Sequence, residues 1–166
     1  MPIPKSLKPL TELLKRQGFR DPEAMANRIA EEGPTELLAR LFVRQAWRYA
    51  VTPGDSSWID EAIASTKRAP CAPYSELGRA LQECRSRGVP DELLTDLARG
   101  VQAAMIFNIS YLLEDANLDD PDLQDVAWGL FQVDDDERPL GAQIVAMHEL
   151  VLAEDPVDRA ARTTDG

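Results

Sequence analysis

The chain has 166 residues, the length of one ordinary domain; 44% of them are hydrophobic and 28% are charged. A chain of this size can bury enough surface to fold without disulfides or a structural metal, and its composition excludes a membrane protein and a chain that is disordered throughout. Two cysteines, Cys71 and Cys84, are too few for a disulfide scaffold or for a metal site of four thiolates. We expect both thiols to be reduced and separate, in a cytoplasmic protein.

The net charge of −11 is concentrated in the last third of the chain. Residues 1–50 have a net charge of +3 and residues 51–100 of −2, whereas residues 101–166 hold 3 basic and 15 acidic side chains, a net charge of −12. A field of this sign repels nucleic acid and anionic membranes, and it speeds encounter with a basic protein. Acidic surfaces also keep proteins soluble without any partner. A purely solubilising role of the acidic residues therefore stays open.

The ends of the chain and its apolar stretches do not predict export or membrane insertion. Prolines at positions 2, 4 and 9 and the lack of an apolar run behind a basic cluster argue against a secretory signal. The longest apolar stretch, 100–113, is shorter than the roughly 20 residues that span a bilayer. Arginine outnumbers lysine 14 to 4, a bias typical of GC-rich genomes, from which we predict a bacterial source.

Helix start and stop signals recur along the chain, whereas the alternation typical of strands is almost absent. We therefore predict an all-α fold, a single compact bundle of about eight helices around a long apolar central helix at about 91–116. One domain covers residues 1–156 in this prediction, and residues 157–166 form a disordered C-terminal tail.

The first half of the chain predicts five helices. Ser6 and Gly18 delimit the first helix, and Asp21 with Pro22 opens the second. The third is apolar around most of its circumference, which predicts a central position. The five predicted ranges are 7–17, 22–32, 35–50, 57–66 and 74–87, with an internal linker near 67–73.

The longest predicted helix, which follows Pro90, is apolar nearly all round in its second half and therefore predicts the core of the domain. Asn108 projects from the same face of this helix as Leu97 and Val101. We expect the Asn108 side chain to be more than about 90% buried and hydrogen-bonded, since an unpartnered buried amide costs a few kcal/mol.

Two further helices are predicted after residue 120. Asp120 and Pro121 open a helix over 121–133, in which Trp128 lies away from the apolar face. An acidic loop follows at 134–137. The last helix begins at Pro139, and its apolar residues recur at helical spacing: Leu140, Ile144, Met147 and Val151.

His148 is the only histidine, and the pattern around it does not indicate catalysis. A zinc-binding helix of the His-Glu-x-x-His kind needs a second histidine at position 152, where the chain has leucine. We expect the His148 side chain to pack against other side chains or to cap a helix. Neither Cys71 nor Cys84 lies in a recognisable nucleophile signature, and the sole base that either could use is His148.

Other motifs that carry chemistry are absent from the sequence. The acidic segments lack the glycine of a calcium-binding EF-hand loop, and one of them contains Pro121. Neither glycine-rich phosphate motif, GxGxxG or GxxxxGK followed by Ser or Thr, occurs. Arg40, Arg44 and Arg48 form a ladder that could hold phosphates, but in so acidic a chain we expect them to bridge to its own carboxylates. We predict no catalytic residue, no cofactor and no metal, and therefore no enzyme.

These observations favour a protein that binds a basic protein partner through its acidic C-terminal third. A bacterial immunity protein or antitoxin, which covers the basic active site of a toxin, has this profile of a compact acidic chain without catalytic machinery. Trp128 is the predicted aromatic anchor amid carboxylates that attract the partner. The predicted partner-binding residues are Trp128, Asp119, Asp120, Asp122, Asp125, Asp134, Asp135, Asp136 and Glu137.

Three alternatives stay open. An enzyme or ligand-binding bundle requires an apolar pocket on which residues such as Asn108, Tyr111, His148 and Trp47 converge. An adaptor or scaffold would share the acidic surface but have no toxin as partner. Trp128 could also pack against a neighbouring helix without binding anything, since tryptophan is usually largely buried.

Overall fold

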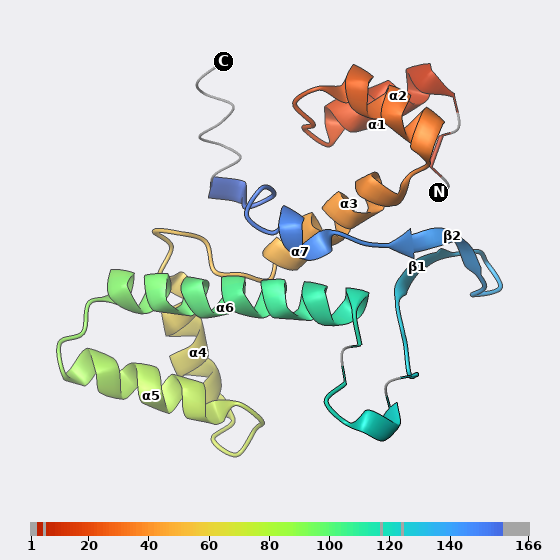
Figure 1. Ribbon diagram of the computed structural model, residues 1–166. Coiled ribbons are helices and arrows are strands. Elements are labelled where there is room, and N and C mark those ends of the chain that lie inside the picture. Colours follow the sequence, from red (N-terminus) through yellow and green to blue (C-terminus); the bar gives the residue numbers. More distant parts are fainter. Residues whose placement is uncertain (1–2, 5, 117, 124, 158–166) are drawn as a thin grey trace. The chain divides into compact units, whose positions relative to one another are not determined.

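The computed structural model describes residues 3–4, 6–116, 118–123 and 125–157 (Figure 1). The chain divides into two compact units. Unit 1 combines Met1–Trp47 with Ile106–Gly166, and unit 2 is Arg48–Met105, so the boundary falls inside the helix α6 (Asp91–Glu114). The described residues are mostly helical, with seven α-helices, a short 3-10 helix and one two-stranded sheet.

The N-terminal helices of unit 1 begin and end where their capping residues predict. The Asp21 carboxylate accepts a hydrogen bond from the Ala24 N–H at 2.9 Å, which satisfies a donor that the helix itself leaves unpaired. Gly18 and Gly33 follow the first two helices with φ of 68° and 93°, a region that favours glycine. The three helices are α1 (Leu7–Arg16), α2 (Pro22–Glu32) and α3 (Thr35–Trp47).

These three helices share one hydrophobic core. The inner faces of α1 and α2 pack against each other and against the first turn of α3, with Phe19 and Leu41 at the edge of the cluster. Each core side chain is at most 9% exposed, and the members are Leu10, Leu14, Met25, Ala26, Ile29 and Leu37. The apolar spacing in the sequence therefore predicts this part of the fold correctly.

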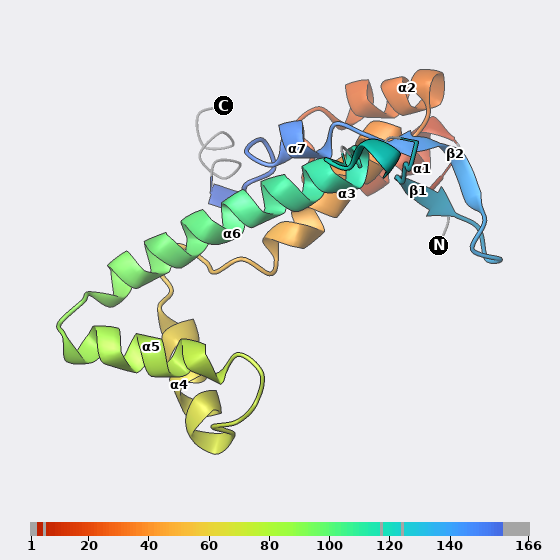
Figure 2. The same ribbon diagram turned by 60° about the horizontal axis from the view of Figure 1, so that its bottom comes forward.

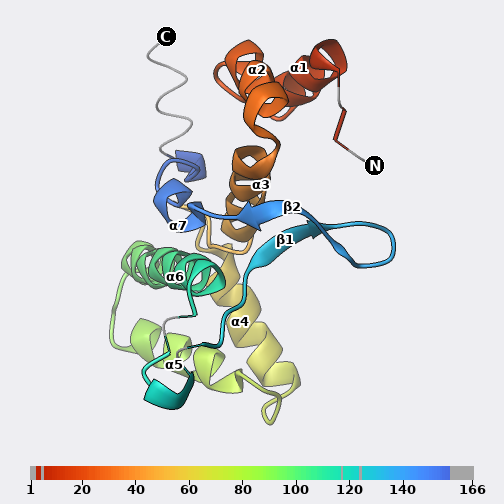
Figure 3. The ribbon, with the colours of Figure 1, turned by 45° about the vertical axis from the view of Figure 1, so that its right-hand side comes forward.

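The prediction of helices at 121–133 and from Pro139 onward is wrong. Residues Pro121–Leu123 form only the 3-10 helix η1, and strands β1 (Leu130–Val133) and β2 (Pro139–Ile144) pair antiparallel. Figure 3 shows this hairpin and the loop at its tip. Of the predicted last helix, α7 keeps only Met147–Leu150.

Turn chemistry explains why a hairpin replaces the two predicted helices. The Asp134 carboxylate accepts hydrogen bonds from the N–H groups of Asp136 and Arg138, both at 2.9 Å, which closes the turn between the strands. A Cβ at Gly129 would come within 2.6 Å of the Gln143 side-chain amide and would displace it. The spacing of apolar residues predicts helices here because it is a local pattern, and it carries no information on pairing with a distant strand.

Unit 2 is built from α4 (Ser57–Arg68), α5 (Ser75–Ser86) and the first part of α6. Figure 2 shows α4 and α5 side by side, and a Cβ at Gly78 would meet Thr66 of α4, so this close crossing requires glycine. Of the predicted linker near 67–73, residues 69–73 belong to the turn between these two helices, and residues 67–68 end α4. The core side chains of the unit are Ile59, Ile63, Leu81 and Leu94.

The long helix α6 forms as predicted, but the prediction that its apolar face is core is wrong. Asn108 is exposed, and so are Leu97 and Val101 on the same face, by 64% and 59%. The periodicity correctly groups these residues on one face of α6, but it does not distinguish a buried apolar face from an exposed one. Among the described helices, α6 included, none combines the length and apolar character needed to cross a bilayer.

Two further predictions concern the cysteines and the tail. Cys71 and Cys84 are both free, as expected. Cys71 is exposed in the turn after α4, and Cys84 packs partly buried at the edge of the unit 2 core. The predicted disordered tail, apart from Val157, lies outside the described residues.

Candidate functional site

The predicted partner-binding carboxylates lie on two segments of unit 1. Asp119, Asp120, Asp122 and Asp125 surround η1, and Asp134–Glu137 form the hairpin loop. The carboxylates therefore lie around a 3-10 helix and on a hairpin loop, and not around the predicted α-helix at 121–133.

Of these eight carboxylates Asp134 alone is half-buried, and the other seven, Asp125 included, belong to exposed residues. Several of them stabilise local structure. Asp134 closes the hairpin turn, Asp136 pairs with Arg138 at 3.4 Å, and Asp120 accepts a hydrogen bond from the Asp122 N–H at 2.9 Å. These contacts explain part of the acidic pattern without any partner.

Trp128 lies between the two acidic segments and is 41% exposed. Its indole Nε1 donates a hydrogen bond to the carbonyl oxygen of Leu112, near the C-terminal end of α6. This bond satisfies a carbonyl of the last turn of the helix, which has no partner within the helix. The indole is therefore held against α6 by its polar edge, while much of its surface stays open to solvent.

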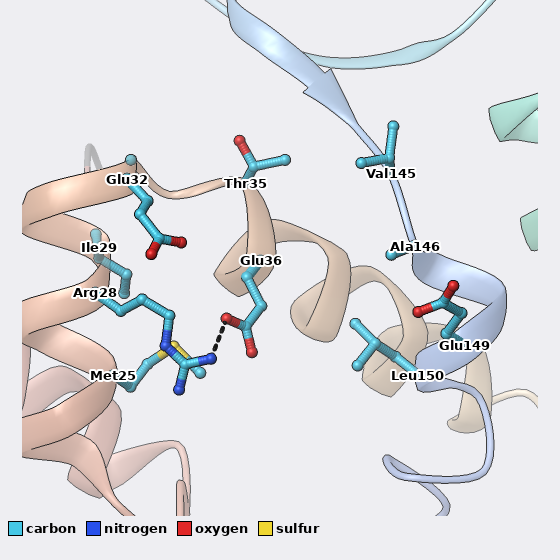
Figure 4. A pocket seen from close by; sticks show the side chains of 11 residues that line it. Met25, Arg28, Ile29, Glu32, Thr35, Glu36, Val145, Ala146, Glu149 and Leu150 are labelled. Carbon is cyan, nitrogen blue, oxygen red and sulfur yellow. Dashed lines mark hydrogen bonds and ion pairs between the residues drawn. The ribbon is translucent and has the colours of Figure 1, made fainter.

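A pocket of about 370 Å³ lies between α2, α3 and the segment 145–150 of unit 1 (Figure 4). Met25 and Ile29 of α2 and Leu150 of α7 supply apolar walls. The charged side chains that line the pocket are Arg28, Glu32, Glu36 and Glu149, three carboxylates and one guanidinium. The pocket therefore combines apolar walls with an excess of negative charge.

Arg28, the one cation among the described residues that line the pocket, is already paired. Arg28 Nη1 lies 2.8 Å from a carboxylate oxygen of Glu36, as the dashed line in Figure 4 shows, and Glu36 also binds Arg40 at 2.9 Å. Glu32 and Glu149 lie on different sides of the pocket, and neither forms an ion pair within the described part of the chain. Two carboxylates thus face this pocket without an ion-pair partner among the described residues.

Next to the pocket, a buried ion-pair cluster fixes the C-terminal segment to α3. The Glu154 carboxylate, 2% exposed, binds the guanidinium groups of both Arg40 and Arg44. Burial disfavours the Arg40 charge, but hydrogen bonds with Glu154 and Glu36 outweigh it and raise the pKa of Arg40. The prediction that this ladder bridges to the chain's own carboxylates is confirmed for Arg40 and Arg44, and for Arg48 it stays a prediction.

The same segment is fixed by one further contact of α3. Trp47 Nε1 donates a hydrogen bond to the carbonyl oxygen of Val151 at 2.8 Å, and both residues are buried. This bond and the Glu154 ion pairs hold α7 beside α3, which places Glu149 and Leu150 at the pocket. On another side of α3, the Arg44 guanidinium lies 4.0 Å from the centre of the Phe19 ring, between α1 and α2.

His148 is packed, as the sequence predicts. Its ring makes edge contacts with Phe107 and Tyr111, at centroid distances of 5.7 and 5.3 Å. Its Nδ1 lies 3.1 Å from Glu114, whose side chain is 10% exposed. Burial works to raise the pKa of Glu114, but the N–H groups of His148 and Ala146 and the histidine ring together lower it.

The polar residues that an enzyme or ligand site was expected to use do not converge on a pocket described here. Asn108 is exposed, Trp47 binds the backbone of Val151, and Tyr111 and His148 contact each other. A second cavity of unit 1, of about 440 Å³, is also lined by none of them. Within the described residues, no group of three or more potential metal-ligating side chains occurs.

Sequence reasoning did not find the acidic pocket. Its lining comes from α2, α3 and residues 145–150, and the sequence contains no local signal that brings the last of these segments to the other two. The one sequence pattern that indicates a charged row at this place is the spacing of four between Arg28, Glu32 and Glu36. Comparison with known protein families, curated proteins and solved structures finds no significant match.

Proposed function

We propose that this protein binds a basic protein partner, and that the acidic pocket receives a lysine or arginine side chain of that partner. The observation that carries the proposal is the pair Glu32 and Glu149, which line a largely apolar pocket and form no ion pair within the described residues. A basic side chain has an apolar stem and a cationic head, so it matches both parts of the pocket.

The charge of the rest of unit 1 supports the same class of partner. Residues 101–166 have a net charge of −12, and the exposed carboxylates of Asp135 and Glu137 lie on the hairpin loop. Val145, which lines the pocket, directly follows β2 of that hairpin. Carboxylates of this kind speed the encounter with a basic protein and set the orientation in which it docks.

An immunity protein or antitoxin that covers a basic toxin is the narrower form of this proposal. It predicts that the gene lies beside a gene for a basic toxin and that coexpression of the two relieves toxicity. A neighbouring gene of unrelated character, with no toxicity to relieve, would contradict this narrower form and leave an adaptor role in its place.

The test uses two labelled peptides of opposite charge. One alternates lysine with leucine, the other alternates glutamate with leucine, and fluorescence anisotropy measures how each binds to the full chain. We expect binding of the lysine peptide only, with an affinity that falls as salt is added, because screening weakens exposed charge pairs. Equal binding of both peptides, or binding that salt leaves unchanged, contradicts the proposal.

A pair of double variants localises the binding. Glu32→Gln with Glu149→Gln removes the two pocket carboxylates, and we expect the lysine peptide to bind about tenfold more weakly, a loss of about 1.4 kcal/mol. The matched control is Glu61→Gln with Glu92→Gln, which removes two exposed carboxylates from unit 2. An equal loss in both double variants would show that net charge alone, and not the pocket, binds the peptide.

A further inference from the structure

A row of four charged side chains leads from the buried ion-pair cluster to the acidic pocket. Glu154 binds Arg40, and the Arg40 guanidinium also binds Glu36. Glu36 in turn binds Arg28, which lines the pocket. The side chains become more exposed along the row, from 2% at Glu154 through 24 and 31% to 47% at Arg28. The position of Arg28 therefore depends on a contact that is itself anchored at a buried carboxylate.

Glu36 uses both of its carboxylate oxygens in this row. Oε1 accepts hydrogen bonds from Nε and Nη2 of Arg40, at 3.0 and 2.9 Å. Oε2 accepts one from Nη1 of Arg28, at 2.8 Å. Hydrogen bonds between ionised groups are the strong ones in proteins. Arg40 therefore fixes the carboxylate of Glu36, and the second oxygen of that carboxylate holds Arg28.

Arg28 leaves a neighbouring carboxylate on its own helix unused. Glu32 follows it by four residues on α2, and side chains at this spacing lie side by side on a helix, with Cβ atoms about 5 to 6 Å apart. Glu32 nevertheless forms no ion pair within the described residues, and Figure 4 shows the Arg28 guanidinium directed to Glu36 of α3. Glu32 and Glu36 thus compete for one guanidinium, and Glu36 binds it.

We propose that Glu36 is a positioning residue of the acidic pocket, because it holds Arg28 away from Glu32 and so leaves Glu32 to a cation of the partner. This inference rests on the function proposed above and identifies the residue that keeps the pocket open to a cation. Without the Glu36 carboxylate, Arg28 turns to Glu32 and becomes an internal competitor of the partner. The Arg28 side chain is 47% exposed, which gives it the freedom to turn.

The distribution of charge in the row adds a second consequence. Arg28 and Arg40 share the single carboxylate of Glu36, so Glu36 does not fully neutralise Arg28. The remaining positive charge lies beside the pocket and repels another cation there. Removal of Arg28 therefore strengthens the attraction between the pocket and a basic side chain, whereas its transfer to Glu32 weakens that attraction.

The first test measures binding of the lysine–leucine peptide to the full chain by fluorescence anisotropy. We expect Glu36→Gln to weaken binding about fivefold, the effect of one exposed ion pair formed at Glu32. The matched control is Glu23→Gln, which removes another carboxylate of α2 and α3 that is paired, with Lys15 at 3.0 Å, but does not line the pocket. An equal loss in both variants overturns the proposal, because net charge then accounts for the effect.

Removal of Arg28 distinguishes its competition from any damage to the fold. We expect Arg28→Gln to bind the peptide more tightly than wild type, and Arg28→Gln with Glu36→Gln to bind it at least as tightly as wild type. Arg28→Gln leaves the pair of Glu36 with Arg40 intact, so it tests the proposal even where Glu36→Gln fails to fold. Weaker binding by Arg28→Gln, or no recovery in the double variant, overturns the proposal.

A measurement without any peptide separates this inference from the proposed function. The NMR resonance of the Glu32 carboxyl carbon, assigned with Glu32→Gln, reports whether a cation lies beside it. We expect Arg28→Gln to shift this resonance in the Glu36→Gln chain and to leave it nearly unchanged in the chain with Glu36. Equal shifts in both chains overturn the proposal, even where the peptide binds. The expected shifts in a wild-type chain that binds no peptide contradict the proposed function alone.

Discussion

Glu114 near the end of α6 caps the short helix that contains His148. Its carboxylate accepts hydrogen bonds from the N–H of His148 at 3.0 Å and of Ala146 at 2.8 Å, and it also lies 3.1 Å from the histidine Nδ1. The N–H groups of the first turn of α7 have no partner within that helix, and Glu114 supplies one from another element. One carboxylate thus joins segments that are far apart in the sequence.

The lowered pKa of Glu114 predicts a pH-dependent contribution to stability. A carboxyl whose pKa is lower in the folded chain stabilises the fold above its ordinary value of 4.5, and this stabilisation is lost as the pH falls below that value. We expect Glu114→Gln to lower the free energy of unfolding by about 1 to 2 kcal/mol at neutral pH. Urea unfolding should show the difference from wild type narrowing below pH 4.5; a constant difference would contradict the assigned role.

The buried Glu154 is expected to be the most sensitive position of the α3 cluster. Glu154→Gln leaves the guanidinium groups of Arg40 and Arg44 without their shared counter-charge, which should cost about 3 kcal/mol of unfolding free energy. The matched control is Glu76→Gln, which breaks the exposed pair with Arg79 and should change stability little. Similar urea midpoints for the two variants would show that the buried cluster does not fix the C-terminal segment.

Local signals in the sequence predict the helices from Leu7 to Glu114 well, because caps and breakers lie next to the residues that they affect. Asp21, Gly33 and Gly88 mark boundaries that the structure confirms to within a few residues. From residue 121 onward, local signals do not predict the structure. Strand pairing joins Leu130 to Ile144, a nonlocal contact, while the apolar spacing of the segment fits a helix equally well.

The difference between local patterns and nonlocal contacts also explains which parts of the candidate sites the sequence predicts. The periodicity of α6 groups Leu97, Val101 and Asn108 on one face, but it does not tell whether the same chain or another covers that face. The acidic surface follows directly from composition. The pocket depends on contacts that hold α7 beside α3, such as the bond from Trp47 to Val151, which no local pattern predicts.

Ser110 offers a substitution that should stabilise the chain. Its hydroxyl is buried and has no hydrogen-bond partner within the described structure. Removing a buried polar group that lacks a partner relieves its desolvation penalty, so we expect Ser110→Ala to raise the free energy of unfolding by about 1 kcal/mol. A loss of stability in thermal and urea unfolding would show that the hydroxyl is bonded in solution.

Thr95 provides the opposite case and a control for Ser110. Its Oγ1 is buried and accepts a hydrogen bond from the indole Nε1 of Trp58 at 3.1 Å. Thr95→Val keeps the shape of the side chain but leaves the indole donor without this acceptor, so we expect a loss of about 1 kcal/mol. The urea midpoint should therefore move in opposite directions for the two substitutions, and a shift in the same direction would contradict our account of one of the two hydroxyls.

The exposed carboxylates of the hairpin loop should act mainly on the rate of association. Asp134 must be kept, because it closes the turn, whereas Asp135 and Glu137 can be reversed to lysine. We expect the double reversal to slow binding of the lysine peptide and to flatten its salt dependence, since steering depends on long-range charge. Stopped-flow anisotropy measures both quantities; an unchanged association rate would exclude the loop from the encounter.

Substitutions of Trp128 distinguish a role in partner binding from a structural role in packing against α6. Its Nε1–H bonds to Leu112, and 41% of the residue is exposed, so the two roles can be separated by two substitutions. Trp128→Phe keeps an aromatic ring but loses the donor, and we expect it to cost about 1 kcal/mol of stability with little effect on peptide binding. Trp128→Ala also removes the exposed apolar surface, and we expect the lysine peptide to bind more weakly by about 2 kcal/mol or more. If Trp128→Ala unfolds the chain, or if the folded variant binds the peptide as tightly as wild type does, Trp128 contributes packing and not binding.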